Sequence, residues 1–213
     1  MARTPPKLKP ILGMKGFYIM QKGNLACTVI QLRSGDFCLH SPVSGLSGPI
    51  KSSLESLGSV KFILAPNHYH NKGLVEFADA FPTATLTASE ESRARLEKVT
   101  GLNFEGLGEL QKAMPTGVQI VRAQGLKTGE VWVFTEKGLL VVDAFAGPSN
   151  GGTSPALLKT FPRYGVKDRE TYVSWMNDFF DAHSPEILIP CHGDIITDAK
   201  LTPKLLTLVN EGL

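Results

Sequence analysis

The sequence predicts an α/β (α+β) protein built as a four-layer αββα sandwich, with two mixed β-sheets packed face to face and helices on the outer faces. The chain has two β-rich blocks, and each block ends in strand–helix units. No linker long enough to separate two domains interrupts the 213 residues. With 42% apolar residues, a chain of this length can bury a substantial core.

The first β-rich block begins with three strands. We expect them over residues 16–20, 26–32 and 37–41, because these runs are rich in β-branched, aromatic and other apolar residues. Gly23-Asn24 and Ser34-Gly35-Asp36 separate the runs, and both are typical of hairpin turns. The block therefore predicts an antiparallel meander.

Strand and helix patterns then alternate. Residues 60–65 form a nearly continuous apolar run, which is typical of a strand buried on both faces. Around this strand we expect a helix within 44–58, a helix over 74–80, a strand over 84–88 and a helix with an acidic start over 90–98.

The second block repeats this rhythm. Strands are predicted over 118–121, 130–134 and 138–143, and Lys137-Gly138 marks a hairpin between the last two. A Gly-, Pro- and Ser-rich loop follows over residues 147–155, and then come a helix over 168–182, a strand over 186–190 and a helix over 201–210.

Composition and charge narrow the class of partner. Lysine and arginine number 22, aspartate and glutamate 20, and the net charge of +2 is too small to argue for nucleic acid or an anionic membrane surface as a partner. No apolar run approaches the roughly 20 residues of a membrane span. We therefore expect a small-molecule substrate or ligand, and the sequence does not indicate an oligomeric state.

The N-terminus and the cysteines indicate a compartment. Residues 1–10 are basic and proline-rich, and no long apolar stretch follows them, so they do not read as a secretory signal. We expect a disordered arm over residues 1–15 and a single domain over 16–213. Three cysteines without a CxxC spacing suit a reducing cytoplasm, which is the predicted location.

Four residues carry the chemistry that the sequence offers. His68 and His70 follow the strand over 60–65, and at positions i and i+2 of an extended segment they would point to the same side. Two imidazoles on one side of a loop suit a metal with nitrogen ligands. Asp143 and His192 each close another apolar strand run.

This pattern resembles the metallo-β-lactamase-fold superfamily, over nearly the whole chain after residue 16. In that family a strand ends in an HxHxDH motif, an aspartate ends a later strand and a last histidine lies in a GHG-like turn. His68 and His70 match the first two histidines, Asp143 the metal-bridging aspartate and His192 the last histidine. The chain looks closest to a divergent branch in which Ala-Pro-Asn precedes the histidines and Ser-Pro ends an early strand. Here these residues are Ala65-Pro66-Asn67 and Ser41-Pro42.

Three positions depart from the family pattern. Lys72 stands where HxHxDH has its aspartate, and Gly73 where it has its third histidine. Leu126 replaces the histidine of a GHTxG-like turn. The resemblance then implies that the first metal keeps two of its three histidines and that the second keeps only His192. The motif predicts a degenerate, at most mononuclear site.

The metal ligands implied by the resemblance are His68, His70, Asp143 and His192. Two histidines and a carboxylate form a known three-ligand set with open positions for water or substrate. We expect one zinc, manganese or iron ion there, or no metal. An alternative role for Asp143 is to cap the backbone N–H groups of the loop behind it.

Three residues are predicted to act in catalysis. His192 is a fourth ligand or a general acid/base, Lys72 orients an anionic substrate group, and Asp194 orients His192. The alternatives are a solvated surface lysine and an exposed turn residue. Tyr69, between the two histidines, is expected to point the opposite way and pack in the core.

The predicted activity is hydrolysis of an ester, lactone or amide by metal-activated water. A non-catalytic binding or scaffold protein that has lost its metals is one alternative, and an iron-dependent redox protein is another. The sequence has no dinucleotide fingerprint, P-loop or Gly-x-Ser-x-Gly elbow, which argues against those enzyme classes.

Overall fold

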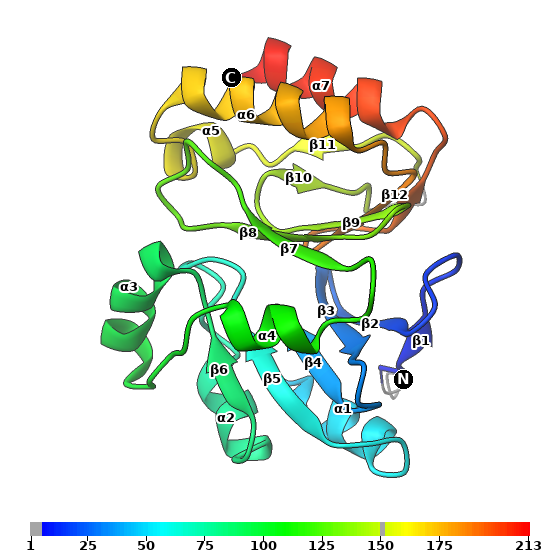
Figure 1. Cartoon of the computed structure of the whole chain (residues 1–213), viewed down its shortest axis with the longest axis vertical. Coiled ribbons are helices and arrows are strands. Elements are labelled where there is room, and N and C mark those ends of the chain that lie inside the picture. Colours follow the sequence, from blue (N-terminus) through cyan, green and yellow to red (C-terminus); the bar gives the residue numbers. More distant parts are fainter. Residues whose placement is uncertain (1–5, 150–151) are drawn as a thin grey trace. The chain divides into compact units, whose positions relative to one another are not determined.

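The structure is a computed structural model that describes residues 6–149 and 152–213. The chain forms two compact units, Met1–Thr116 and Gly117–Leu213 (Figure 1). Each unit contains one large mixed sheet with helices, as the sequence predicts. That residues 16–213 fold as a single domain stays a prediction.

The first unit is built on a six-stranded sheet of order β1-β2-β3-β4-β5-β6. The first four strands pair antiparallel, and β4, β5 and β6 pair parallel. The strands are β1 Lys9–Pro10, β2 Phe17–Lys22, β3 Leu25–Gln31, β4 Phe37–His40, β5 Val60–Leu64 and β6 Thr85–Thr87. The helices are α1 Ser47–Leu54, α2 Leu74–Ala80, α3 Glu90–Thr100 and α4 Gly108–Ala113.

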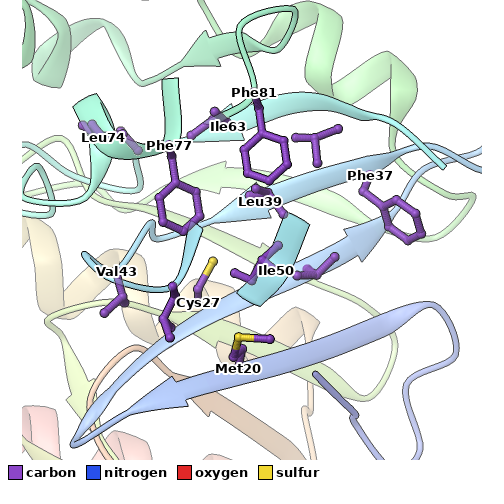
Figure 2. Packing of buried hydrophobic residues seen from close by; sticks show 14 of the residues in the cluster. Met20, Cys27, Phe37, Leu39, Val43, Ile50, Ile63, Leu74, Phe77 and Phe81 are labelled. Carbon is purple, nitrogen blue, oxygen red and sulfur yellow. The ribbon is translucent and has the colours of Figure 1, made fainter. Parts of the chain in front are cut away.

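The core of the first unit lies on one face of this sheet. Figure 2 shows Phe37 and Leu39 of β4 in one apolar cluster with Ile63 of β5, Ile50 of α1 and Phe77 of α2. Because side chains alternate along a strand, His40 belongs to the opposite face. That face is buried too, since His40 is only 1% exposed.

The predicted N-terminal arm is paired with the sheet where it is described. Lys9–Pro10 form β1 opposite Tyr18 and Ile19 of β2, and the side chains of Ile11 and Met14 are buried. Residues 9–14 therefore differ from the expected disordered arm, because Lys9–Pro10 pair with β2 and the side chains of Ile11 and Met14 are buried. Residues 1–5 lie outside the described residues.

The second unit is built on a five-stranded sheet of order β13-β12-β9-β8-β7, in which only β12 and β9 pair parallel. The strands are β7 Gln119–Arg122, β8 Val131–Phe134, β9 Gly138–Val141, β12 Ile187–Pro190 and β13 Ile196–Thr197, and a separate ribbon joins β10 Phe145–Ala146 to β11 Ala156–Leu157. The helices are α5 Phe161–Tyr164, α6 Arg169–Ala182 and α7 Leu201–Gly212.

Helices α6 and α7 pack beside each other over the core of the second unit (Figure 1). Asp168 caps α6 by accepting a hydrogen bond from the Thr171 N–H at 3.1 Å. Trp132 of β8 is fully buried, and its ring lies 5.0 Å from that of Trp175 of α6. In the part of the chain that the structure describes, no helix has the length and apolar character needed to cross a bilayer.

Candidate metal centre

Asp143 and His192 lie together in the second unit. They follow β9 and β12, which are parallel neighbours with Val141 opposite Pro190, so both loops leave the same edge of the sheet (Figure 1). Nε2 of His192 lies 3.1 Å from Oδ1 of Asp143, and the two side chains are 20% and 16% exposed. Two atoms of the kinds that bind metals therefore meet in a mostly buried position.

Glu130 holds the turn that carries Asp143. This fully buried carboxylate accepts hydrogen bonds from the N–H groups of Val142, Asp143 and Ala144 at 3.3–3.4 Å and from the Trp132 indole at 3.0 Å. Burial, and then the Asp143 carboxylate, raise the pKa of Glu130 to about 7, while the N–H donors oppose that shift. Sequence reasoning missed this role, although an acidic residue at the head of an apolar strand run is a signal that could have shown it.

Two glycines fix the loop that carries His192. The Gly147 N–H donates to the His192 carbonyl at 2.8 Å, and a Cβ on Gly147 would collide with the Asp194 carbonyl. Gly193 has a φ of +89°, and a Cβ there would collide with the Gly147 carbonyl. The Asp194 N–H donates to the Pro148 carbonyl at 2.8 Å. Its predicted role in orienting His192 stays a prediction.

In the first unit the two histidines lie on a turn rather than on an extended segment. The Asn67 side-chain oxygen accepts hydrogen bonds from the N–H groups of Tyr69 and His70, at 2.9 and 3.1 Å. His68 is 8% exposed, and its ring lies edge-on to that of Tyr69 at 4.4 Å. The alternation argument for the pair is therefore wrong, and the two rings have different surroundings.

Tyr69 also differs from its prediction. Its side chain is 39% exposed rather than in the core, and the Arg95 guanidinium of α3 lies 5.0 Å from its ring centroid. The turn at Asn67 directs the Tyr69 side chain towards solvent, where its ring packs against the Arg95 guanidinium.

His70 contacts Ser41, the serine of the Ser-Pro pair noted in the sequence. Nδ1 of His70 lies 2.9 Å from Oγ of Ser41, which directly follows β4. Ser41 is fully buried, whereas His70 is partly exposed. The Ser41 hydroxyl therefore contacts a candidate ligand.

The packing of the first unit explains why glycine stands at position 73. Gly73 is buried before α2, and a Cβ on it would lie 2.5 Å from the carbonyl oxygen of Pro42. A histidine at this position does not fit beside that backbone. Lys72, by contrast, is exposed, and its predicted role in orienting an anionic group stays a prediction.

Leu126 is part of the core of the second unit. It packs in the apolar cluster with Tyr172 and forms an isolated bridge with Val166. Gly125 before it has a φ of +74°, and a Cβ there would lie 2.5 Å from the Tyr172 nitrogen. The side chain at position 126 is thus used for packing.

His40 gives the chain an expected acid sensitivity. Neither ring nitrogen has a hydrogen-bond partner among the described residues, and burial, then the charge of His70, lower the His40 pKa from 6.5 to about 3. Between these values the unfolded chain binds a proton that the folded chain does not. Stability should therefore fall as the pH drops below 6.5, with His40 contributing a loss of about 2 kcal/mol by pH 5.

Urea denaturation at pH 7 and pH 5, in chelator, measures this loss. His40→Asn should flatten the pH dependence, whereas His183→Asn, at a partly exposed histidine, should leave it unchanged. An equal slope in the parent and His40→Asn would show that His40 does not cause the acid sensitivity.

The fold has well-matched relatives among solved structures. No protein-family model and no curated protein matches the sequence. The metallo-β-lactamase FIM-1 from Pseudomonas aeruginosa, in its mono-zinc form, is 12% identical over 98% of this chain and 96% of its own, with a TM-score of 0.69. A metallo-β-lactamase from Hirschia baltica is 11% identical over 97% of this chain and 98% of its own, with a TM-score of 0.69.

A third structure belongs to a different kind of protein. The Flv1 flavodiiron core from Synechocystis is 12% identical over 98% of this chain and 62% of its own, with a TM-score of 0.64. At these identities the likeness establishes the fold and no activity. The predicted fold class is confirmed: this chain has the metallo-β-lactamase fold.

Proposed function

We propose that the protein binds one divalent metal ion through His70, Asp143 and His192 and hydrolyses a small ester, lactone or amide. The observation that carries the proposal is the 3.1 Å approach of His192 Nε2 to Asp143 Oδ1 at the ends of two parallel strands. We assign the second imidazole to His70, one of the two histidines that match the family's HxHxDH motif. Two histidines and one carboxylate fit zinc or iron and leave positions open.

His70 is favoured over His68 as the ligand from the first unit. The His68 ring is buried edge-on against Tyr69, whereas His70 is partly exposed and already has a polar contact to one ring nitrogen. A ligand histidine usually makes such a contact through the nitrogen that does not bind the metal.

When bound, such an ion lowers the pKa of water towards neutrality and polarises a substrate carbonyl. The chain's own residues prepare the site for it. Glu130 holds the backbone around Asp143, and the contact between Gly147 and Gly193 holds the loop of His192. His192 Nε2 is the atom at which this chain would bind the ion or hold a proton, and the exposed Lys72 ammonium would attract an anionic substrate group.

Two metals, zinc and iron, fit the proposed ligand set. Likeness to a mono-zinc metallo-β-lactamase supports zinc, and likeness to a flavodiiron core supports iron. Iron-dependent redox chemistry at the same three residues is therefore the second candidate function.

Elemental analysis of untagged protein tests the proposal. We expect about one zinc or iron ion per chain, and loss of the metal in His70→Ala and Asp143→Ala, because each removes one of three ligands. Hydrolysis of ester and lactone substrates should fall at least 100-fold in both variants. His183→Ala, which removes a histidine packed against Phe134 and Phe179, is the control and should keep metal and activity.

Two results would contradict the proposal. If the protein takes up no metal after reconstitution with zinc, manganese and ferrous iron, a binding or scaffold role replaces it. If His68→Ala loses the metal while His70→Ala keeps it, the ligand set is wrong.

A further inference from the structure

The backbone of Ser41 is strained at a position next to His70, the proposed ligand from the first unit. Ser41 is the only non-glycine residue with a positive φ, +57°, in the part of the chain that the structure describes. A side chain in this left-handed region meets its own backbone, so serine adopts it at a cost. Such conformations persist where the surrounding structure imposes them, often at functional sites.

Neighbouring groups prevent the turn after β4 from relaxing. The Ser41 N–H donates to the Leu64 carbonyl of β5 at 3.1 Å. The next carbonyl, that of Pro42, lies against Gly73, where a Cβ would be 2.5 Å away. Glu76 of α2 accepts hydrogen bonds from the Ser44 hydroxyl at 3.0 Å and the Gly45 N–H at 2.7 Å. The conformation of Ser41 is thus set from both ends.

The strained conformation of Ser41 determines where its hydroxyl group lies. It carries the fully buried Ser41 hydroxyl to 2.9 Å from Nδ1 of His70. The backbone of His70 is held separately, because its N–H donates to the Asn67 side chain at 3.1 Å. The backbone N–H and the ring of His70 therefore contact different groups, and the Ser41 hydroxyl is the group at Nδ1.

We propose that Ser41 is a positioning residue for His70: its hydroxyl accepts the Nδ1–H of the imidazole and keeps the lone pair on Nε2. The hydrogen bond at one ring nitrogen decides which nitrogen is free of a proton. Only a deprotonated nitrogen binds a metal, and an acceptor on the other nitrogen also sets the ring plane. That Nε2 then serves a metal rests on the function proposed above.

The side chain of His70 can be observed without any metal. Long-range proton–nitrogen NMR spectra of the imidazoles, recorded at pH 8 in chelator, distinguish the two neutral tautomers, and a His70→Asn variant assigns the signals. We expect the Nδ1–H form of His70 in the parent. In Ser41→Ala the signals should move towards the Nε2–H form, because the acceptor is gone.

Zinc titration gives the second measurement. Loss of an outer partner of a ligand histidine typically weakens metal binding roughly 10- to 100-fold, and we expect this for Ser41→Ala. Ser41→Gly also removes the hydroxyl but accepts a positive φ, so it should unfold at the parent's temperature or above and still bind zinc as weakly as Ser41→Ala. A purely structural role for Ser41 does not produce that combination.

Ser44→Ala is the matched control, because it removes a hydroxyl of the same turn that contacts Glu76 instead of His70. It should leave the His70 tautomer and the zinc affinity unchanged. The proposal is overturned if the parent shows the Nε2–H form, if Ser41→Ala and Ser41→Gly leave the tautomer unchanged, or if Ser44→Ala has the same effect as Ser41→Ala. If the tautomer depends on Ser41 but no zinc binds, the role of Ser41 stands and the metal proposal fails.

Discussion

Replacing Glu130 with alanine is expected to lower the free energy of unfolding by roughly 3–5 kcal/mol. The change leaves the Trp132 indole and three backbone N–H groups without their acceptor inside the second unit. The turn that carries Asp143 then loses its anchor, so metal content should fall together with stability. Urea denaturation and elemental analysis of the same preparation measure both effects.

Graded variants separate the carboxylate from the space that it fills. Glu130→Gln keeps one acceptor oxygen and should lose less stability than Glu130→Ala. Trp132→Phe removes a single donor and most of the ring is kept, so a loss of about 1–2 kcal/mol is expected. Glu136→Ala, at an exposed acidic residue of the same unit, should change stability by no more than about 0.5 kcal/mol. An unchanged urea midpoint in Glu130→Ala would show that the carboxylate does not hold the turn.

Restoring a histidine at position 73 is expected to destabilise the protein rather than to create a second metal site. Even Gly73→Ala places a Cβ 2.5 Å from the Pro42 oxygen and 3.0 Å from the Ser44 nitrogen, which are backbone atoms. Gly73→Ala should cost roughly 2–3 kcal/mol, and Gly73→His about 3 kcal/mol or more. Thermal unfolding and the zinc content at saturation measure the two consequences.

Gly48 offers a control for this substitution. It lies inside α1, and a Cβ there meets nothing within 4 Å. Gly48→Ala should therefore be neutral or stabilise the protein by up to about 1 kcal/mol, as alanine does inside a helix. A Gly73→His protein that keeps the parent's stability and binds two zinc ions per chain would show that the turn after β4 gives way, and that one metal is not the limit of this fold.

Much of the secondary structure could be predicted because its signals are local. The turn residues Gly23-Asn24 and Lys137-Gly138 are followed by the expected antiparallel pairings of β2 with β3 and of β8 with β9. The long helix α6 covers Arg169–Ala182, close to the predicted range of 168–182, and Asp168 is its N-cap. The short elements α4, α5, β10 and β11 were not predicted, because two to six residues carry too little periodicity to stand out.

The sequence by itself determined the residue types of the site. Asp143 and His192 could be named because each is a polar residue that closes an apolar run, which is a local pattern. Only the tertiary structure decided that they meet, since β9 and β12 pair in parallel across 49 residues of chain. The tertiary structure also shows that His68 and His70 do not follow strand alternation. They lie on a turn in which the Asn67 side chain accepts hydrogen bonds from two backbone N–H groups.

The supporting roles of Glu130 and Ser41 depend entirely on the tertiary structure. The local sequence does not show that Glu130 accepts hydrogen bonds from a turn 12–14 residues away, or that Ser41 meets His70 across 29 residues. The reason is physical: the sequence records which groups can donate, accept or ionise, whereas burial and the choice of partner depend on strands paired far apart in the chain. Burial and the available hydrogen-bond partner set the free-energy cost of each polar group. They therefore decide which of the candidate residues can serve in the site.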